Sequence, residues 1–262
     1  MNTVINKVQI EGNFSLLKIL LIVMIAIGAS YPKLGITAFA PKYVVNTRIH
    51  ELEPIFSSPL SFLLEKKPIL LTFDDGPSNP GIDRALLAIL EKHSAKSIWF
   101  VNCRHLDPAL TTQFNLNRET LTEIKSEGNL IENHGYNHLN LVKLDSINPE
   151  LMRSEINACS NYIETLTGAR PKYLRPPWGQ YNSDIKDYAK SQDMKLMLWT
   201  LGSQDWLSKD ATKMDSIRDY MRNIVPKNGD VIVFHDRAIT VSFLDEFLTR
   251  LDRLGYIYVV PN

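Results

Sequence analysis

The sequence predicts an α/β fold in which parallel strands form a barrel. Beyond residue 67, short apolar runs alternate with longer segments of helical period, and parallel neighbouring strands need crossover connections of this kind. A barrel is favoured over an open sheet because unusual polar residues stand at or just after the ends of the runs, and barrel strand ends converge on one face. These residues are Asp74, Asn102, His134, Arg175, Asp205 and His235.

Length and composition fit one folded domain after an N-terminal leader. Of the 262 residues, 44% are hydrophobic and 22% are charged, which is an ordinary globular mixture. The 29 basic and 29 acidic side chains cancel, so the chain has no basic footprint for nucleic acid, and a neutral polymer is the easier partner. We expect a monomer.

The N-terminus has the features of an export signal. Lys18 precedes an apolar run over 19–29, and Ala38-Phe39-Ala40 offers small residues around a cleavage point. The run is shorter than the roughly twenty residues of a spanning helix, although a snorkelling Lys18 could extend it. We expect a signal peptide or membrane anchor over 1–40, a lead-in segment over 41–66 and the catalytic domain over 67–262. The protein would be secreted, periplasmic or anchored on the outer face, touching a membrane only through an uncleaved anchor.

Seven short apolar runs are the expected strands, and the third and fourth are weak when taken alone. They cover residues 69–73, 97–102, 130–133, 173–175, 195–201, 230–234 and 256–260.

Three helices carry start or stop signals. Asn148 and Pro149 are placed as the cap and first residue of a helix that Gly168 closes, with an apolar face from 152 to 166. A second helix is expected over 240–254, followed by Gly255 as a left-handed cap. Asn182 is expected to start the third.

Asp74 and Asp75 are the first candidates for chemistry. Two adjacent carboxylates at the end of an apolar strand would repel one another in a low-dielectric pocket unless a cation or an arginine separates their roles. A metal ion meets this need. Asp-Gly-Pro is also good turn chemistry, so the pair alone fits a solvated turn equally well.

His134 and His138 are a second candidate pair. Histidines four positions apart can face the same side of a turn or helix, and with one carboxylate they supply three ligands and leave positions open for water. A lone HxxxH pattern is common by chance, so alone it more often marks ordinary surface or core histidines.

Three further fragments place polar groups at the ends of runs. Arg175, before Pro176-Pro177-Trp178-Gly179, could hold a carboxylate bidentately. Asp205 and His235 end two other runs, and a carboxylate beside an imidazole would fix its tautomer and raise its pKa. Taken singly, a surface ion pair, a helix cap and a histidine with satisfied hydrogen bonds are the favoured alternatives.

Cys103 and Cys159 are the only cysteines. Their spacing matches neither a zinc knuckle nor a CxxC redox motif. They could pair after export if their geometry permits, but two half-buried thiols are the favoured interpretation.

Together and in order, the five fragments resemble the polysaccharide deacetylase family, the NodB-homology or carbohydrate esterase family 4 domain, over residues 67–260. The matching motifs are TFDDGP at 72–77, His134 with His138, RPPWG at 175–179, QDW at 204–206 and Val233-Phe234-His235. The resemblance implies a distorted (β/α)7 barrel, in agreement with the seven apolar runs.

The resemblance also implies a metal and a base. Asp75, His134 and His138 would bind a divalent metal, zinc in the first place, with cobalt or nickel as alternatives. Asp74 would be the general base that deprotonates a metal-activated water, and Arg175 would hold Asp74.

The remaining matched positions concern the leaving group and the substrate. His235, tethered by Asp205, would protonate the departing amine. Val233 and Trp206 would line the acetyl pocket and groove wall. Trp178 would contact the substrate, and a backbone N–H near it would stabilise the oxyanion.

Two positions depart from the family pattern. Gly135 stands where the second motif usually has serine or threonine, so we expect a looser loop that lacks a hydroxyl hydrogen bond but keeps its metal. Gly202 stands where the fourth motif often has a further aspartate, which puts any role of that residue in doubt.

The sequence thus predicts an exported, metal-dependent hydrolase that removes N-acetyl groups from an N-acetylglucosamine-containing polysaccharide, peptidoglycan or chitin-like. The alternatives are an O-acetyl, xylan-type esterase using the same site and a non-catalytic sugar-binding relative, although no expected site residue is missing. An intracellular amidase is disfavoured by the leader, and a serine hydrolase by the lack of a G-x-S-x-G motif.

Overall fold

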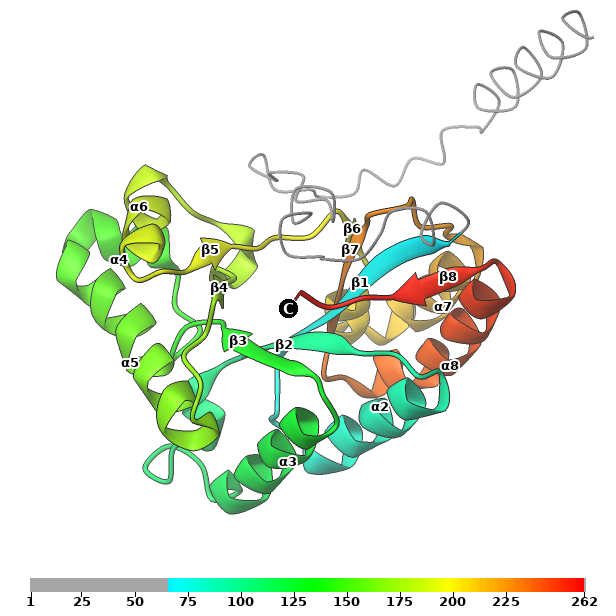
Figure 1. The fold of residues 1–262 in the computed structure, drawn as a ribbon, viewed down its shortest axis with the longest axis horizontal. Helices are drawn as coiled ribbons and strands as arrows, with labels where there is room; N and C mark the ends of the chain where they lie inside the picture. The colour runs from blue at the N-terminus through cyan, green and yellow to red at the C-terminus, as the bar shows by residue number, and fades with distance from the viewer. Residues whose placement is uncertain (1–65, 262) are drawn as a thin grey trace, which may run out of the picture. The chain divides into compact units, whose positions relative to one another are not determined.

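A computed structural model describes residues 66–261 of the chain (Figure 1). The leader expected over 1–40 and almost all of the lead-in segment lie outside these residues, so both stay predictions. Within the described range, we find no helix with the length and apolar character needed to cross a membrane.

The described chain forms one parallel sheet of eight strands. Seven follow the order β5-β4-β3-β2-β1-β7-β6, and β8 pairs with the start of β1. The longest strand is β1 (Lys67–Asp75), which lies between β2 (Ser97–Val101) and β7 (Val231–His235). The others are β3 (Leu130–Asn133), β4 (Tyr173–Leu174), β5 (Lys195–Leu196), β6 (Leu201–Gly202) and β8 (Tyr256–Tyr258).

The expected run at 195–201 is two strands and not one. β5 and β6 lie at opposite ends of the sheet order, so in the described residues the barrel is open between them. The reason is a contact with a residue distant in sequence: the carbonyls of Met197 and Leu198 accept hydrogen bonds from the Arg175 side chain, both at 3.0 Å. They therefore do not bond to a neighbouring strand.

The helices begin and end close to the expected signals. Asn148 caps α5, Gly168 closes it with φ 72, and Asn182 caps α6 by accepting from the Ile185 N–H at 2.9 Å. Gly255 follows α8 with φ 80. The helices are α2 (Pro80–Lys92), α3 (Phe114–Ser126), α4 (Leu141–Ile147), α5 (Pro149–Thr167), α6 (Ser183–Ser191), α7 (Met214–Asn223) and α8 (Ala238–Arg253). Short 3-10 helices are η3 (Cys103–Leu106), η4 (Pro177–Gly179), η5 (Asp205–Lys209) and η6 (Ala211–Lys213).

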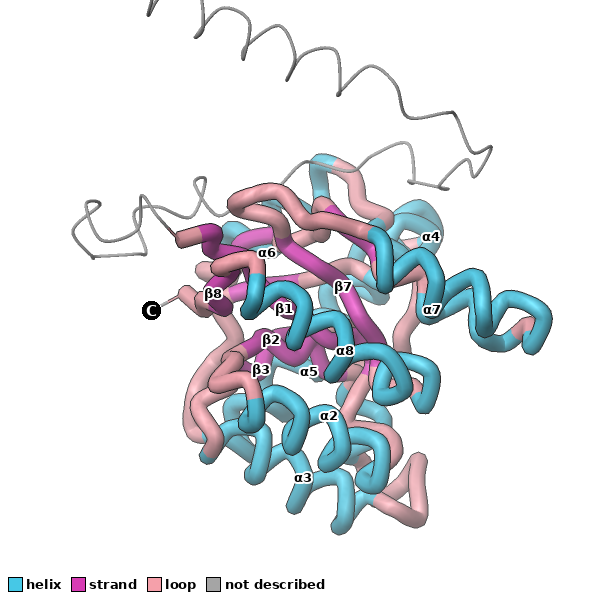
Figure 2. Tube along the Cα trace, turned by 90° about the vertical axis from the view of Figure 1, so that its right-hand side faces the viewer, coloured by secondary structure: helices cyan, strands magenta, loops and turns pink. Residues whose placement is uncertain are grey.

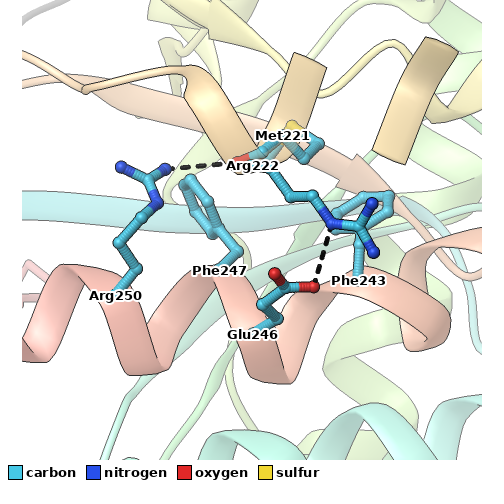
Figure 3. A pocket seen from close by; sticks show the side chains of 6 residues that line it. All are labelled: Met221, Arg222, Phe243, Glu246, Phe247 and Arg250. Atoms are coloured by element: carbon cyan, nitrogen blue, oxygen red, sulfur yellow. Dashed lines mark hydrogen bonds and ion pairs between the residues drawn. The ribbon is translucent and has the colours of Figure 1, made fainter. Parts of the chain in front are cut away.

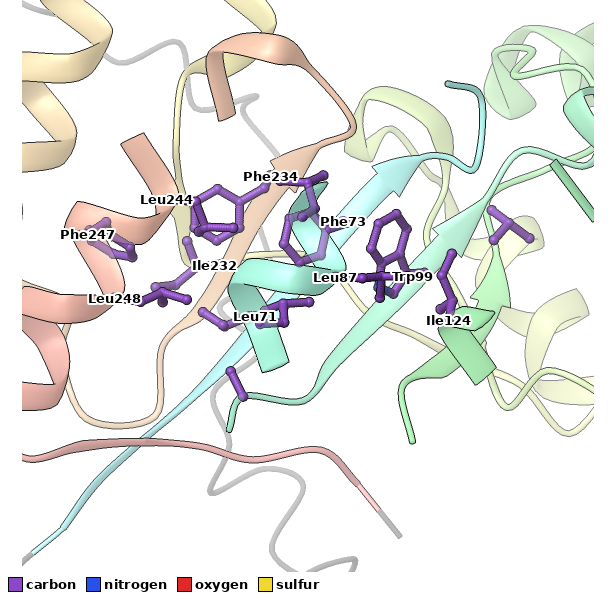
Figure 4. Close-up of a cluster of buried hydrophobic side chains, with 14 of the residues drawn as sticks. Leu71, Phe73, Leu87, Trp99, Ile124, Ile232, Phe234, Leu244, Phe247 and Leu248 are labelled. Carbon is purple, nitrogen blue, oxygen red and sulfur yellow. The ribbon is translucent and has the colours of Figure 1, made fainter. Parts of the chain in front are cut away.

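The main core lies between the sheet and the helices α2, α3 and α8, which run along its outer side (Figures 1 and 2). Phe73 stacks between Trp99 and Phe234, with ring centroids 4.8 and 5.4 Å away (Figure 4). Because side chains alternate along a strand, Leu71 and Phe73 enter this core while Thr72 and Asp74 face the other side. This alternation positions the site.

Cys103 and Cys159 form a disulfide, so the interpretation as two half-buried thiols is wrong. Cys103 opens η3 just after β2, and Cys159 lies on the buried face of α5. Their Cα atoms are 5.4 Å apart, within the range that a disulfide requires. Both residues are fully buried.

Candidate active site

The two carboxylates at the end of β1 both lie near His134 Nε2, at 3.8 Å for Asp74 Oδ2 and 3.7 Å for Asp75 Oδ1, but they have different further partners. Asp74 continues the strand and is buried on its inner face. Asp75 has a left-handed backbone with φ 78, an uncommon conformation outside glycine. Its Oδ1 atom lies 3.3 Å from His138 Nε2 and 3.7 Å from His134 Nε2.

The two histidines present their Nε2 atoms to Asp75. His134 follows β3, and its Nδ1 lies 2.6 Å from the carbonyl oxygen of Arg175. Since a carbonyl only accepts, Nδ1 carries the proton and Nε2 keeps its lone pair. Burial, together with the nearby His134, lowers the pKa of His138 to about 4, so that ring is neutral at pH 7.

Asp75, His134 and His138 form a group that can hold a metal ion, with one ligand atom from each lying within 4.8 Å of the others. Asp75 Oδ1 is buried and has no hydrogen-bond partner among the described residues, which a cation would satisfy. Burial raises the pKa of Asp75, but nearby positive charge, that of His235 first, outweighs this effect and lowers the pKa. Two imidazoles and one carboxylate match an open catalytic zinc site.

Arg175 fixes Asp74 from inside the sheet. It is fully buried, and its Nη1 donates to Asp74 Oδ1 at 2.6 Å and to Thr72 Oγ1 at 2.8 Å. Its guanidinium also lies 4.0 Å from the centre of the Phe100 ring. Thr72 in turn donates to the Ile232 carbonyl at 2.8 Å. In the sequence, Thr72 stands out only as part of the TFDDGP motif.

Asp205 and His235 form a hydrogen-bonded pair. His235 Nδ1 lies 2.7 Å from Asp205 Oδ1, while Asp205 Oδ2 accepts from the His235 N–H and the Thr240 hydroxyl, both at 2.7 Å. Burial lowers the pKa of His235, but the charge and hydrogen bond of Asp205 outweigh burial and raise the pKa to about 9. Burial has the opposite effect on Asp205 and raises its pKa, but His235 and Thr240 outweigh burial and lower the pKa of Asp205 below its ordinary value.

Two tryptophans flank these groups. Trp178 is 50% exposed and sits edge-on to the His138 ring, with centroids 4.6 Å apart. Trp206 lies edge-on to His235 at 5.8 Å. Val233 is only 1% exposed and lies within β7, where it pairs with Thr72 and Gly202.

Gly202, one of the two departures, is explained by packing. A Cβ atom at this position would lie 2.6 Å from the Trp206 ring. The Trp206 side chain therefore occupies the space that an aspartate would need.

The structure brings the seven expected ligands and catalytic residues to the carboxyl ends of the strands. One neighbour was missed: Arg237 Nη2 lies 3.9 Å from Asp75 Oδ2. Its only sequence signal is its position two residues after His235.

A small pocket between α7 and α8 lies elsewhere and shares no residue with this site (Figure 3). Two of its side chains bond to other lining residues: Arg222 Nε donates to Glu246 at 3.2 Å, and Arg250 donates to the Met221 carbonyl at 3.2 Å. It is lined by Met221, Arg222, Phe243, Glu246, Phe247 and Arg250.

Known proteins share both the sequence pattern and the fold. The pattern of the family described as polysaccharide deacetylase matches residues 64–197. The chain is 32% identical over 198 residues to the peptidoglycan-N-acetylmuramic acid deacetylase PdaC of Bacillus subtilis, covering 75% of this chain and 38% of that protein. It is 27% identical over 209 residues to a peptidoglycan-N-acetylglucosamine deacetylase of Bacillus cereus, covering 78% of this chain and 69% of that protein.

The fold agrees with these matches. The solved structure of PdaC from Bacillus subtilis is 28% identical and superposes with a TM-score of 0.61, covering 74% of this chain and 87% of the solved one. The family expected from the five motifs and the distorted parallel barrel are therefore both confirmed. This chain belongs to the polysaccharide deacetylase family.

Proposed function

We propose that the protein is an exported, metal-dependent hydrolase that removes N-acetyl groups from a peptidoglycan-type polysaccharide. The observation that carries this proposal is the buried Asp75 Oδ1, which faces the Nε2 atoms of His134 and His138 and has no hydrogen-bond partner in the part of the chain that the structure describes. The Bacillus relatives are named for N-acetylmuramic acid and for N-acetylglucosamine. Both sugars carry the acetamide that such a site would cleave.

Asp75, His134 and His138 would hold the divalent cation, zinc first and cobalt or nickel as alternatives. A cation bound there would acidify a water molecule and polarise the acetamide carbonyl. Histidine and carboxylate donors suit this class of metals.

Asp74 and His235 would move the two protons of the reaction. Arg175 occupies Asp74 Oδ1, which leaves Oδ2 to accept a proton from the attacking water. Asp205 holds His235 Nδ1, so the Nε2–H is left to protonate the departing amine as the C–N bond breaks. The products are acetate and a free amino sugar.

The residues lining the site would recognise the sugar. Trp178 and Trp206 flank the candidate metal group and the His235 ring, where exposed aromatic surface can contact a sugar ring. Trp178 has a left-handed backbone with φ 57, and we propose that a backbone N–H in this turn stabilises the oxyanion. Val233 would form the floor of the acetyl pocket.

The buried disulfide supports export. Disulfides form and persist in oxidising compartments and are rare in the cytosol, and Cys103–Cys159 crosslinks η3 to α5 inside the fold. This agrees with a leader over 1–40 ahead of a catalytic domain over 67–262. We propose a monomer that acts outside the cytoplasm on the cell wall, with no nucleic-acid partner.

Acetate release from a panel of polymers tests the substrate. We expect acetate and free amine in equal amounts from peptidoglycan, and from chitin oligomers if the sugar N-acetylglucosamine suffices. Acetate from acetylated xylan alone would favour the O-acetyl esterase. A protein that binds metal and these polymers but releases no acetate would be a non-catalytic sugar-binding relative.

A further inference from the structure

The backbone beside each metal ligand is held by a buried carboxylate that the proposed chemistry does not use. Glu155 holds the loop between His134 and His138. Asp236 holds the turn that follows Asp75. Both side chains are buried, so their hydrogen bonds matter for the geometry of the backbone that they bind.

Glu155 bonds to the residue just before His138. It lies on α5 with 5% of its surface exposed. One carboxylate oxygen accepts from the Asn137 backbone N–H, and the other accepts from Asn137 Nδ2 at 3.2 Å. A rigid helix therefore fixes the backbone from which the His138 ring extends.

Gly135 makes room for this carboxylate. Its φ is +83, and a Cβ atom there would lie 3.4 Å from Glu155 Oε1. The Gly135 N–H donates to Asn133 Oδ1 at 2.7 Å, and Asn133 Nδ2 donates to Ser160 Oγ on α5 at 2.8 Å. The backbone of Gly135, which has no hydroxyl, is thus connected to α5 through Asn133.

Asp236 acts in the same way on the other side of the site. It is 8% exposed, and its Oδ2 accepts from the Ser78 N–H at 3.2 Å and from the Ser78 hydroxyl. The same oxygen would lie 3.0 Å from a Cβ atom at Gly76. The turn Gly76–Ser78 begins directly after Asp75. It therefore packs against Asp236, the residue that follows β7, and is hydrogen-bonded to it.

We propose that Glu155 and Asp236 are positioning residues of the metal site, holding His138 and Asp75 at the spacing that a metal ion needs. The inference rests on the proposed function, because it requires that the Asp75, His134 and His138 group binds metal. Groups that orient metal ligands from outside typically change affinity about 10–100-fold when removed.

Zinc affinity, measured by competition with a chromophoric chelator, tests this without reference to turnover. We expect Glu155→Ala and Asp236→Ala to weaken zinc binding by about 10-fold or more. Asp236→Asn keeps an acceptor for both Ser78 bonds and should bind zinc nearly as wild type does. Glu155→Gln keeps one of two acceptors and should be intermediate. Gly135→Ser should weaken binding, because a residue with a side chain is strained at φ +83 and its Cβ atom would contact Glu155 Oε1.

Asp230 offers a matched control at the opposite end of β7. It is 7% exposed and also holds a loop, accepting from the Thr200 hydroxyl at 2.8 Å and the Lys227 N–H at 2.5 Å. Asp230→Ala should lower the melting temperature and leave zinc affinity unchanged. If an alanine variant does not fold, Glu155→Gln and Ser78→Ala each remove one hydrogen bond and should still weaken binding.

The outcomes separate the two proposals. A folded wild-type protein that binds no divalent metal overturns the proposed function and this inference together. If wild type binds zinc and the folded Glu155 and Asp236 variants bind it equally well, the inference alone is wrong. The same holds if Asp230→Ala weakens zinc binding as much as they do, since the effect would then follow stability.

Discussion

Asp74 and Asp75 are chemically identical neighbours with different surroundings. Asp74 bonds to a buried guanidinium through one oxygen, while Asp75 Oδ1 faces two imidazole nitrogens and has no hydrogen-bond partner within residues 66–261. Side chains alternate along a strand, and Asp75, the last residue of β1, also has a left-handed φ of 78. We therefore assign the proton to Asp74 and the metal to Asp75.

Asp74→Asn should separate these two roles. The amide can still accept a hydrogen bond from Arg175 but cannot take a proton, so we expect acetate release to fall about 10²–10⁴-fold. Metal content, measured by elemental analysis of the same sample, should stay at the wild-type level. If Asp74→Asn loses its metal, the base and ligand roles are assigned to the wrong residues.

His235 should set the alkaline limit of activity. An acid must be protonated, and the pKa of His235 is raised to about 9 by Asp205 against the effect of burial. A cation beside Asp75 would lower it, so we expect kcat to fall as pH rises through a value no higher than about 9. Asp205→Asn removes the negative charge and should move this limb to lower pH. An unmoved limb, or unchanged turnover in His235→Ala, would show that His235 is not the acid.

At the scale of elements, features that depend on nearby residues could be predicted from the sequence, and features that depend on distant residues could not. Asn148 and Asn182 cap helices through bonds to residues two or three positions away, so their spacing is visible in the chain. The break between β5 and β6 depends on Arg175, more than twenty residues before it, and has no local sign. Glu155 could have been found, because its position falls on the apolar face of α5.

The candidate site was predictable for a related reason. The residues expected as ligands and catalytic groups stand at strand ends, and parallel strands bring their carboxyl ends together. Each fragment alone also fitted an ordinary turn, cap or core histidine, and only their order separated the interpretations. The disulfide was missed because its cysteines are 56 residues apart, and sequence spacing contains no information on their Cα distance.

The first turn of α2 carries a buried carboxyl group with a stability cost. Asp83 is fully buried, accepts from the Asn79 N–H at 3.1 Å through Oδ2, and has no partner on Oδ1 in the described range. Burial, and then the charge of Asp236, raise its pKa. The folded state therefore favours the protonated form of Asp83. Its favourable effect on the free energy of unfolding is complete at low pH and is lost as pH rises from about 4, the ordinary aspartate value, through the raised pKa.

Asp83→Asn should remove this cost. Since one unit of pKa shift corresponds to about 1.4 kcal/mol, we expect the variant to be more stable than wild type at pH 8 by ~1 kcal/mol or more, with a smaller difference at pH 5. Urea unfolding at both pH values measures it. Asp215, in the first turn of α7 with a side chain 94% exposed, is the control, and Asp215→Asn should show no such trend. Equal effects of Asp83→Asn at both pH values would contradict the assignment.

At the scale of the whole molecule, the disulfide joins η3 to α5, the helix that also carries Glu155. A crosslink over 56 residues restricts the unfolded chain, so replacing both cysteines by alanine should cost about 2–4 kcal/mol in the free energy of unfolding. Urea unfolding of the double variant, beside wild type with and without reductant, measures this. A double variant as stable as oxidised wild type would show that the disulfide contributes nothing to the fold.

The central claim is that one metal site at the strand ends removes N-acetyl groups. Acetate release from purified peptidoglycan, followed before chelation, after chelation and after zinc is added back, tests it most directly. We predict that chelation abolishes release, that zinc restores it, and that His134→Ala with His138→Ala stays inactive under all three conditions. Release that persists at the wild-type rate after complete removal of metal would contradict the account.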